Sequence, residues 1–412
     1  MTVAPVNPAS IVRARERSPL EYRAFLGMMM AASAISIDLI LPAFGRIRHD
    51  LHLADTSSQT TRLISIFFLG LACGPIPFGL LSDRVGRRIV LWLSCVVMIV
   101  AALVCGLASS LALMVVCRFF WGVGASGLRV VATAMVRDRY SGDRMAREMA
   151  FVWTVFILVP VVAPLAGAGI IHVVAWRWTF VVCAAFAAAL GAWSLRIAET
   201  LPVERRQRLH IAQIGIATQA IVRSRKALGY SLALLPLFAV FSSYLGSSEL
   251  IVGDVFHRAG QFPFIFGGTA VLMGLASHVA GHHVMRLGLD RVILLALSAY
   301  VVAAAALAVV GRGHGGHPSF WVWLPLLALV LAAHNVLFPN LNAAAMGPVG
   351  HVAGTAAAVI VTASTAFGAL VGQRINDAFD GSVRTLSTAF AMAGAIALVL
   401  CLWAGRSRAV HR

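Results

Sequence analysis

The chain has 412 residues, of which 60% are hydrophobic and 12% are charged, and its mean hydropathy is +0.87. A water-soluble protein of this length exposes far more charge, so the composition excludes an ordinary soluble domain and indicates an integral membrane protein. The formal net charge is +17. In a membrane protein, such an excess of basic residues is first interpreted as a signal for the orientation of the loops in the membrane, and nucleic-acid binding is considered only after that.

Apolar runs separated by polar breaks predict twelve membrane-spanning helices. Most runs are close to the ~20 residues that cross about 30 Å of hydrocarbon. The first follows a tail with Arg13, Arg15 and Arg17 and has the length of a full span, so it is predicted as a helix and not as a cleavable signal peptide. The predicted limits are 23–43, 60–81, 89–108, 111–136, 149–172, 178–197, 227–250, 262–284, 292–311, 319–342, 353–376 and 386–404.

Basic residues are unevenly distributed between the two sides of these spans. An even number of spans puts both termini on one side, and the tails and loops of that side hold 23 of the 33 basic residues against 8 on the other side. The remaining two, Arg118 and Arg129, lie inside a span. The positive-inside rule therefore predicts both termini in the cytoplasm, and nucleic acid is not expected as a partner.

A polar segment in the middle of the chain separates six spans from six. Between its groups of charges, the apolar stretch Ile211–Val222 is suited to a helix on the membrane surface. The predicted organisation is a cytoplasmic tail (1–22), an N-terminal six-helix bundle (23–197), a central cytoplasmic loop (198–226), a C-terminal six-helix bundle (227–404) and a second tail (405–412).

The connection between the second and third predicted spans is short and highly charged. It reads Gly79-Leu80-Leu81-Ser82-Asp83-Arg84-Val85-Gly86-Arg87-Arg88. Charges this close together cannot lie in hydrocarbon, so the stretch predicts a tight cytoplasmic turn in which the glycines permit close helix approach and a sharp bend. A degenerate copy follows 202 residues later, with Gly281, Arg286 and Gly288 in the places of Gly79, Arg84 and Gly86, which indicates two related halves.

Two charges lie at a similar predicted depth in the first and fourth spans. Asp38 is about five residues, or roughly 7–8 Å, from the outer end of its span, and it shares a small-residue face with Gly27, Ala31 and Ala34. A carboxylate there is costly and should face the bundle interior, unless it only anchors the interface. An ion pair with Arg118 would lower the cost of both charges, as a proton-coupling element or as a fixed structural salt bridge.

Further polar and flexible positions are candidates for function. Arg129 follows Arg118 by eleven residues on nearly the same face, and it either reaches the headgroups, contacts an inner gate or attracts an anionic group of a substrate. The fifth span contains two prolines and closely spaced glycines, which suit a bent helix at a moving contact. The positions concerned are Pro160, Pro164, Gly167 and Gly169.

The second half carries its own intramembrane polar residues. Glu249 and Asp254 lie at the outer end of the seventh span, and His334 and Asn335 lie deep in the tenth, where we expect them to line a cavity. His278 and His282 share a face of the eighth span, but no carboxylate or thiol accompanies them at metal-site spacing. The six cysteines all fall in apolar runs, so no metal site and no disulfide framework is expected.

Several segments resemble a known family. The charged turn is similar to the G-x-L-x-D-R-x-G-R-R loop of the major facilitator superfamily (MFS) of transporters. The segment Ile37–Ala43 is similar to the D-M-Y-L-P-A element of the bicyclomycin and chloramphenicol resistance (Bcr/CflA) group of drug/proton antiporters. Arg118 with Gly122 resembles the R-x-x-Q-G element of that group, with Trp121 in place of the glutamine. The segments 163–167, 176–180 and 350–356 also look like this group.

The resemblance implies an all-α integral membrane fold of twelve helices in two pseudo-symmetric six-helix bundles. It implies proton coupling at Asp38 and Arg118, and it places Asp83 near the start of the eleventh helix, around Gly354. Arg129 and Glu249 depart from the group and are possible secondary sites. The implied substrate cavity includes Ala34, Trp121, Pro164, His334 and Asn335, and the implied gating residues are Gly79, Asp83, Arg84, Gly86, Arg87, Arg88, Pro160 and Gly167.

The function implied is proton-coupled efflux of a hydrophobic or amphipathic drug by alternating access, without enzymatic activity. The sequence has no G-x-x-x-x-G-K-S/T loop, so the proton gradient and not ATP is the expected energy source, and no cofactor is expected. The alternatives are a metabolite importer or uniporter of the same fold, or a membrane sensor that transports nothing. The expected setting is a bacterial inner membrane, with lipid as the surrounding partner and the chain as a monomer.

Overall fold

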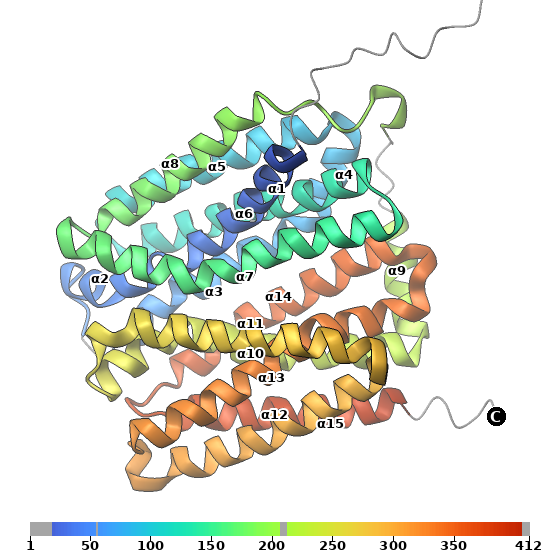
Figure 1. Cartoon of the computed structure of the whole chain (residues 1–412). Helices are drawn as coiled ribbons and strands as arrows, with labels where there is room; N and C mark the ends of the chain where they lie inside the picture. The colour runs from blue at the N-terminus through green and yellow to red at the C-terminus, as the bar shows by residue number, and fades with distance from the viewer. Residues whose placement is uncertain (1–18, 55–56, 207–211, 406–412) are drawn as a thin grey trace, which may run out of the picture.

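The computed structural model describes residues 19–54, 57–206 and 212–405, and its regular structure is helical (Figure 1). Within these ranges no strand is present. Eleven helices there are long and apolar enough to cross a membrane, and the pair Ser58–Cys73 and Pro75–Val85, which is bent by 41°, counts as a twelfth. The prediction of twelve spans in an all-α membrane fold is therefore confirmed.

Seven helices carry the spans of the first half. The bent second span is α3 with α4, and the break falls at Gly74–Pro75, where the proline lacks the N–H that would continue the hydrogen-bond ladder. The helices are α1 (Pro19–Asp38), α3 (Arg62–Cys73), α4 (Pro75–Val85), α5 (Arg87–Leu107), α6 (Leu111–Arg139), α7 (Gly142–Val173) and α8 (Arg177–Ser194).

Six helices carry the spans of the second half. They are α10 (Arg225–Leu250), α11 (Phe262–Leu287), α12 (Leu289–Arg312), α13 (Phe320–Met346), α14 (Ala353–Asp377) and α15 (Arg384–Gly405). A π-helical turn, Ile251–Val255, extends α10, and the surface helix predicted between the halves is α9 (Ala212–Arg223), which packs against α14 and α10. Residues 1–18 and 406–412 of the predicted tails lie outside the described ranges.

The first predicted span is longer than the sequence indicated, and it is broken. α1 ends at Asp38, a 3-10 turn follows at Leu41–Ala43, and α2 (Phe44–Asp50) continues outward. Pro42 in this turn cannot donate to the helical ladder, which explains the break. The whole helical segment Leu20–Asp50 has 31 residues, so Asp38 lies well inside it and not about five residues from its end.

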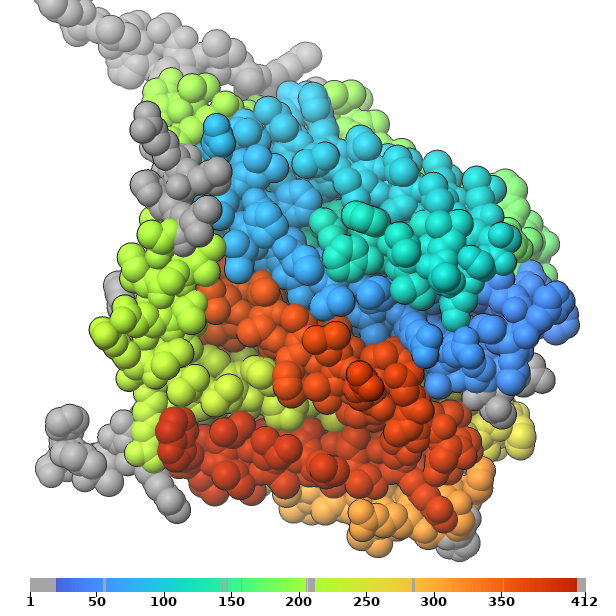
Figure 2. All heavy atoms as spheres, turned by 180° about the vertical axis from the view of Figure 1, so that it is seen from behind, coloured from blue at the N-terminus to red at the C-terminus, as the bar shows by residue number. Residues whose placement is uncertain are grey.

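The two halves lie side by side as two bundles (Figures 1 and 2). α3 packs against α14 and α7 packs against α11, and these are the main contacts between the bundles. We call the side where α1 begins and α9 lies the terminal side, and the opposite side, with α2, the distal side (Figure 1). Large apolar side chains such as Leu107 and Val309 are exposed on the outside of the bundles, as expected for surfaces that face lipid.

The internal repeat seen in the sequence is reproduced in backbone conformation. Gly86 joins α4 to α5 with φ = +105°, and Gly288 joins α11 to α12 with φ = +81°. Residues with a Cβ rarely adopt such angles, so both turns require glycine. The equivalent position in each half thus has the same physical role, which supports the relation between the two bundles.

Helix packing inside the N-terminal bundle depends on glycines that sequence reasoning did not single out as packing residues. A Cβ at Gly122 of α6 would lie 2.1 Å from the carbonyl oxygen of Phe67, and one at Gly70 of α3 would lie 2.0 Å from that of Phe119. The α3 and α6 backbones therefore touch directly. Without a hydrophobic driving force in lipid, such close backbone contact is a main source of helix association.

We predict that Gly122→Ala destabilises the protein, because the backbone of α3 would have to move away. The expected loss is about 1–3 kcal/mol, the usual cost of overpacking a core, and it should appear as a lower melting temperature in detergent. The control is Gly268→Ala in α11, where a Cβ meets no atom within 4 Å. That variant should be neutral or slightly stabilised, and equal melting of both variants would contradict the packing argument.

Candidate functional site

Asp38 is a buried carboxyl group at the break between α1 and the following turn. Its side chain is only 3% exposed and makes no hydrogen bond and no ion pair with the residues that the structure describes. The turn that follows it, Leu41–Ala43, contacts α10 of the other bundle. The carboxyl group therefore lies near the boundary between the two bundles.

Arg118 is fully buried, and backbone carbonyls hold its guanidinium. Its Nε donates to the carbonyl oxygen of Leu63 at 3.1 Å, and its Nη1 donates to that of Ser36 at 2.7 Å. The guanidinium also lies 4.4 Å from the ring centroid of Phe67. Ser36 is in the last turn of α1, whose carbonyls have no partner within the helix, so Arg118 caps the broken end of α1.

The predicted ion pair between Asp38 and Arg118 is absent from this structure. Arg118 approaches α1 from the side of Ser36, whereas Asp38 comes two residues later and therefore points about 200° away around the helix. The contact with Ser36 keeps Arg118 near the level of Asp38. The predicted distance of Asp38 from the outer end of its span was too short, and the rotation of each side chain about its helix decided against a pair.

Trp121 belongs to the interior of the N-terminal bundle and does not line a cavity as predicted. Its side chain is fully buried, its Nε1 donates to Ser36 Oγ at 3.0 Å, and its ring lies 5.8 Å from that of Phe180. Gly167, by contrast, makes the close helix contact that its type suggested, because a Cβ there would lie 2.1 Å from the carbonyl oxygen of Leu39. This contact fixes α7 against the residue that follows Asp38.

The other small and proline positions of this bundle lie in continuous helices. α7 runs unbroken through Pro160 and Pro164, and Pro164 is buried. Ala34 is also buried, and Gly27, which shares its face of α1, packs closely against Val155 of α7. The small face of α1 therefore serves helix packing along at least part of its length.

His334 lies in a cluster of rings that crosses the boundary between the bundles. It stacks on Phe241 with ring centroids 4.9 Å apart, and its Nδ1 is buried without a hydrogen-bond partner. We call this group the central aromatic cluster. Its members, joined by successive ring contacts, are Phe68, Phe238, Phe241, Tyr244, His334 and Phe338.

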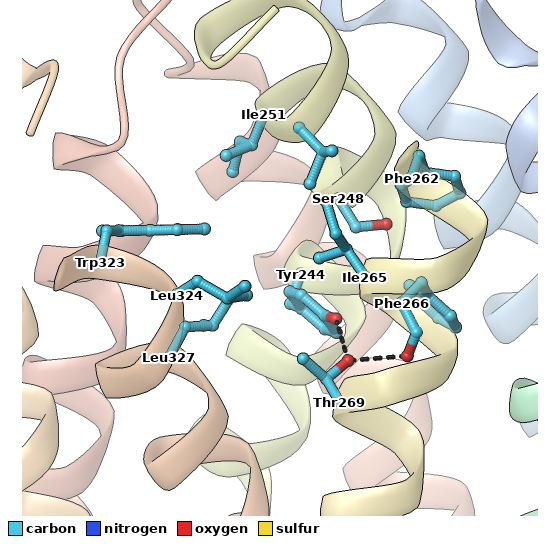
Figure 3. Close-up of a pocket in the computed structure, with 11 residues that line it drawn as sticks. Tyr244, Ser248, Ile251, Phe262, Ile265, Phe266, Thr269, Trp323, Leu324 and Leu327 are labelled. Atoms are coloured by element: carbon cyan, nitrogen blue, oxygen red, sulfur yellow. Dashed lines mark hydrogen bonds between the residues drawn. The ribbon is translucent and has the colours of Figure 1, made fainter. Parts of the chain in front are cut away.

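Asn335 is next to His334 in sequence but has a different environment. Its Nδ2 donates to the Met273 carbonyl oxygen at 2.9 Å and to Ser277 Oγ at 2.8 Å, so its amide connects α13 to α11 within one bundle. A small apolar pocket of about 10 Å³ lies further toward the distal side, between α10, α11 and α13 (Figure 3). Tyr244 and Thr269 line it, and their hydroxyls are 3.4 Å apart.

A group of three charged residues joins the two bundles on the distal side. Arg48 of α2 is buried, and its Nη1 lies 2.8 Å from Glu249 Oε2 at the end of α10. Its Nη2 lies 3.2 Å from Asp254 Oδ2. We call Arg48, Glu249 and Asp254 the distal latch. The sequence indicated both acids but not Arg48, because Arg48 lies after the predicted end of the first span, whereas in the structure it belongs to α2.

Every other ion pair or side-chain hydrogen bond that joins the bundles in the described ranges also lies on the distal side. Thr61 and Gln373 exchange hydrogen bonds of 3.3–3.4 Å, and Arg62 lies 3.9 Å from Asp377. The structure is therefore closed on the distal side by polar contacts, and no polar contact of this kind closes the terminal side in the part of the chain described.

The charged turn on the terminal side forms a network within the N-terminal bundle. Arg87 is buried and contacts Asp83 at 2.6 Å and Asp138 at 2.9 Å. Glu199, which follows α8, accepts the backbone N–H groups of Arg87 and Arg88 at 3.0 Å and so caps α5. Asp138 and Glu199 were not predicted from the sequence, although each is an acid just after an apolar run.

The remaining residues of this turn differ in environment. No hydrogen bond or ion pair joins Asp83 to α14 among the described residues, and the side chain near Gly354 is instead that of Arg137, whose Nη1 lies 3.6 Å from a Cβ placed there. Arg84 is exposed, and Arg88 lies over the Trp92 ring. A Cβ at Gly79 would meet no atom within 4 Å, so the expected close approach at Gly79 is absent in this distally closed conformation.

We predict that Arg48→Gln opens the distal side. It leaves two carboxylates near each other without their cation, and breaking a buried pair in this way costs about 3–5 kcal/mol. The measurement is the distance between spin labels at His49→Cys and Ala259→Cys, both exposed distal positions, in a Cys73→Ala background. A longer-distance population should appear.

The matched control for the latch is Arg177→Gln. Arg177 also pairs with a distal acid, Asp50 at 3.3 Å, but both residues belong to the N-terminal bundle. Its distance distribution should match that of the unsubstituted protein. If Arg48→Gln gives the same distribution as this control, the latch does not hold the bundles together.

Comparison with known proteins assigns the chain to a family. A model of the Major Facilitator Superfamily matches residues 24–373. The chain is 26% identical to a bicyclomycin resistance protein homolog of Haemophilus influenzae, over 88% of this chain and 90% of that one. It is 26% identical to the multidrug resistance protein MdtL of Salmonella heidelberg, over 79% and 80% of the two chains.

Solved structures agree on the fold. The D-xylose-proton symporter superposes with a TM-score of 0.76 at 13% identity, over 93% of this chain and 97% of that one. An identity this low supports the fold alone, whereas the family model covers most of the chain. The chain therefore belongs to the Major Facilitator Superfamily of membrane transporters.

Proposed function

We propose that this transporter exports hydrophobic or amphipathic small molecules in exchange for protons, by alternating access across a bacterial inner membrane. Its two relatives with resistance names support efflux as the direction. The observation that carries the proposal is Asp38: a buried carboxyl group, unpaired among the described residues, near the boundary between the bundles. Such a group can exchange its proton with whichever side the boundary opens to.

The arrangement suggests how proton and substrate compete. An ionised Asp38 is costly while the boundary is closed around it, so closure favours the protonated group, and opening to water permits its release. The central aromatic cluster lies at the same boundary, which it crosses between Phe68 of α3 and Phe238 of α10, and it offers flat apolar surface to an amphipathic compound. Arg118 then acts on Asp38 indirectly, because it holds the end of α1 from which Asp38 projects.

The gating roles follow from the same geometry. Breaking the distal latch and forming contacts on the terminal side would convert the present conformation into one open to the distal side. Asp83 is positioned on the terminal side to approach the start of α14 when that side closes, where the positive end of the helix dipole favours a carboxylate. The residue limits of the tails, bundles and central loop, and the monomeric state, stay predictions.

Asp38→Asn should abolish gradient-driven transport, because the amide cannot ionise. The measurement is accumulation of aromatic amphipaths, carrying positive, no or negative charge, in inside-out vesicles with an imposed pH gradient. Exchange without a gradient should survive. The control is Asp380→Asn. Asp380 lies outside the spans, in the connection before α15, and a hydrogen bond from Ser382 lowers the pKa of its carboxyl group. Uptake by Asp38→Asn at the unsubstituted rate would place the coupling elsewhere.

The orientation of the chain has an independent test. In the Cys73→Ala background, an impermeant thiol reagent added to intact cells should label His49→Cys on the distal side but not Glu204→Cys on the terminal side. The reason is the excess of arginine on the terminal side, which retains it in the cytoplasm. Labelling of Glu204→Cys from outside would reverse the proposed orientation.

A further inference from the structure

Arg129 is a cation inside a membrane-spanning helix for which the described residues supply no counter-charge. Its guanidinium makes no hydrogen bond and no ion pair with them. Glu148, the acid of α7 closest in sequence to the rings beside Arg129, is itself paired with Arg23 at 2.7 Å. An uncompensated charge at this depth is costly unless water or a ligand supplies the missing partner.

The guanidinium of Arg129 lies against two aromatic rings inside the span. It lies 5.9 Å from the ring centroid of Trp153 and 5.6 Å from that of Phe156, both on α7. These residues come six and nine positions after Arg147, where the apolar span of α7 begins, which is about 9–14 Å along the helix. The two rings hold the charge at that level, away from the terminal end of the bundle.

The helices that carry Arg129 and the two rings, α6 and α7, lie next to the boundary between the bundles. α6 meets α1 at Tyr22 and Ser36, and α8 meets α1 on the neighbouring side at Phe25, whereas α7 meets α1 at Gly27. α7 also packs against α11, and α3, which packs against α6, contacts α14. The α6–α7 pair is therefore adjacent to the C-terminal bundle.

The accessibility of Arg129 differs from that of Arg118. Arg118 is fully buried: its Nε and Nη1 donate to two backbone carbonyls, and its Nη2 is enclosed without a partner among the described residues. Arg129 is half-buried, and Trp153 beside it is 40% exposed, so both present accessible surface. Of the two intramembrane arginines, Arg129 is the one whose guanidinium a ligand can reach.

We propose that Arg129, Trp153 and Phe156 form a binding site for an aromatic anion, in which the guanidinium binds a carboxylate and the rings contact the aromatic part. Planar guanidinium matches the two oxygens of a carboxylate, and such charge-assisted pairs are strong away from water. This proposal narrows the substrate class of the proposed function to aromatic anions. It rests on the proposed function in one respect only, namely that the chain binds a substrate.

The test measures binding of three radiolabelled probes of one shape, 2-naphthoate, 2-naphthamide and 2-naphthylmethylammonium, to the purified full chain by equilibrium dialysis. The unsubstituted protein should bind 2-naphthoate most tightly. Arg129→Gln should weaken 2-naphthoate binding by about tenfold or more and change 2-naphthamide binding by less than about twofold. Arg129→Lys should recover part of the loss, because it keeps the charge but not the planar fork.

Two further variants separate this site from general effects of charge and packing. Arg258→Gln is the matched control, because Arg258 also lies over two rings, at 4.7 Å from Phe320 and 5.6 Å from Trp321, but between α10 and α11 on the distal side. It should leave all three affinities unchanged. Trp153→Leu should weaken all three probes by a similar factor, because ring contact does not depend on probe charge.

Three outcomes would overturn the proposal: no binding of 2-naphthoate by the unsubstituted protein, equal affinity for the acid and the amide, or equal loss of all probes in Arg129→Gln. Binding is measured without a pH gradient, so it is independent of Asp38 and proton coupling. Charge-selective binding that depends on Arg129, together with normal gradient-driven uptake by Asp38→Asn, would support the anion site and reject the proposed coupling.

Discussion

The capping of the broken first helix by Arg118 is the interaction on which the central part of the structure depends. A helix that ends inside a membrane leaves carbonyl groups without partners, and hydrocarbon offers none. Arg118 supplies donors to Ser36 of α1 and Leu63 of α3, and its neighbour Trp121 donates to the Ser36 hydroxyl. One buried cation thus replaces the missing hydrogen-bond ladder and holds three helices in fixed relation.

This use of Arg118 determines what Asp38 can do. Because the arginine satisfies backbone carbonyls, it is not available as a partner for the carboxylate on the other face of α1. Asp38 is left near the boundary between the bundles with its charge unbalanced by the described residues, and a group in that situation is sensitive to proton exchange and to water. A structural salt bridge between them would have stabilised one conformation and removed this sensitivity.

Polar contacts are distributed so that the bundles can separate on one side at a time. The distal latch and the contacts of Thr61 and Arg62 join the bundles on one side. On the other side, the strong ionic network of Arg87 is confined to the N-terminal bundle, where it stiffens the turn after α4. Separation on the terminal side therefore breaks none of the ion pairs described there, whereas separation on the distal side must break several.

The sequence by itself determined the number and order of the spans, the twofold repeat and the family, because these follow from run length, charge spacing and glycine positions that act locally. It also identified Asp38, Arg118, Arg129 and Glu249, since a charge in an apolar run is costly wherever it points. Only the tertiary structure decided their partners. Arg118 caps α1, Glu249 meets Arg48, Trp121 is a packing residue, and Arg129 lies between two rings. The reason is rotational: a spacing fixes depth along a helix, but which neighbour lies at that angle depends on how twelve helices pack together.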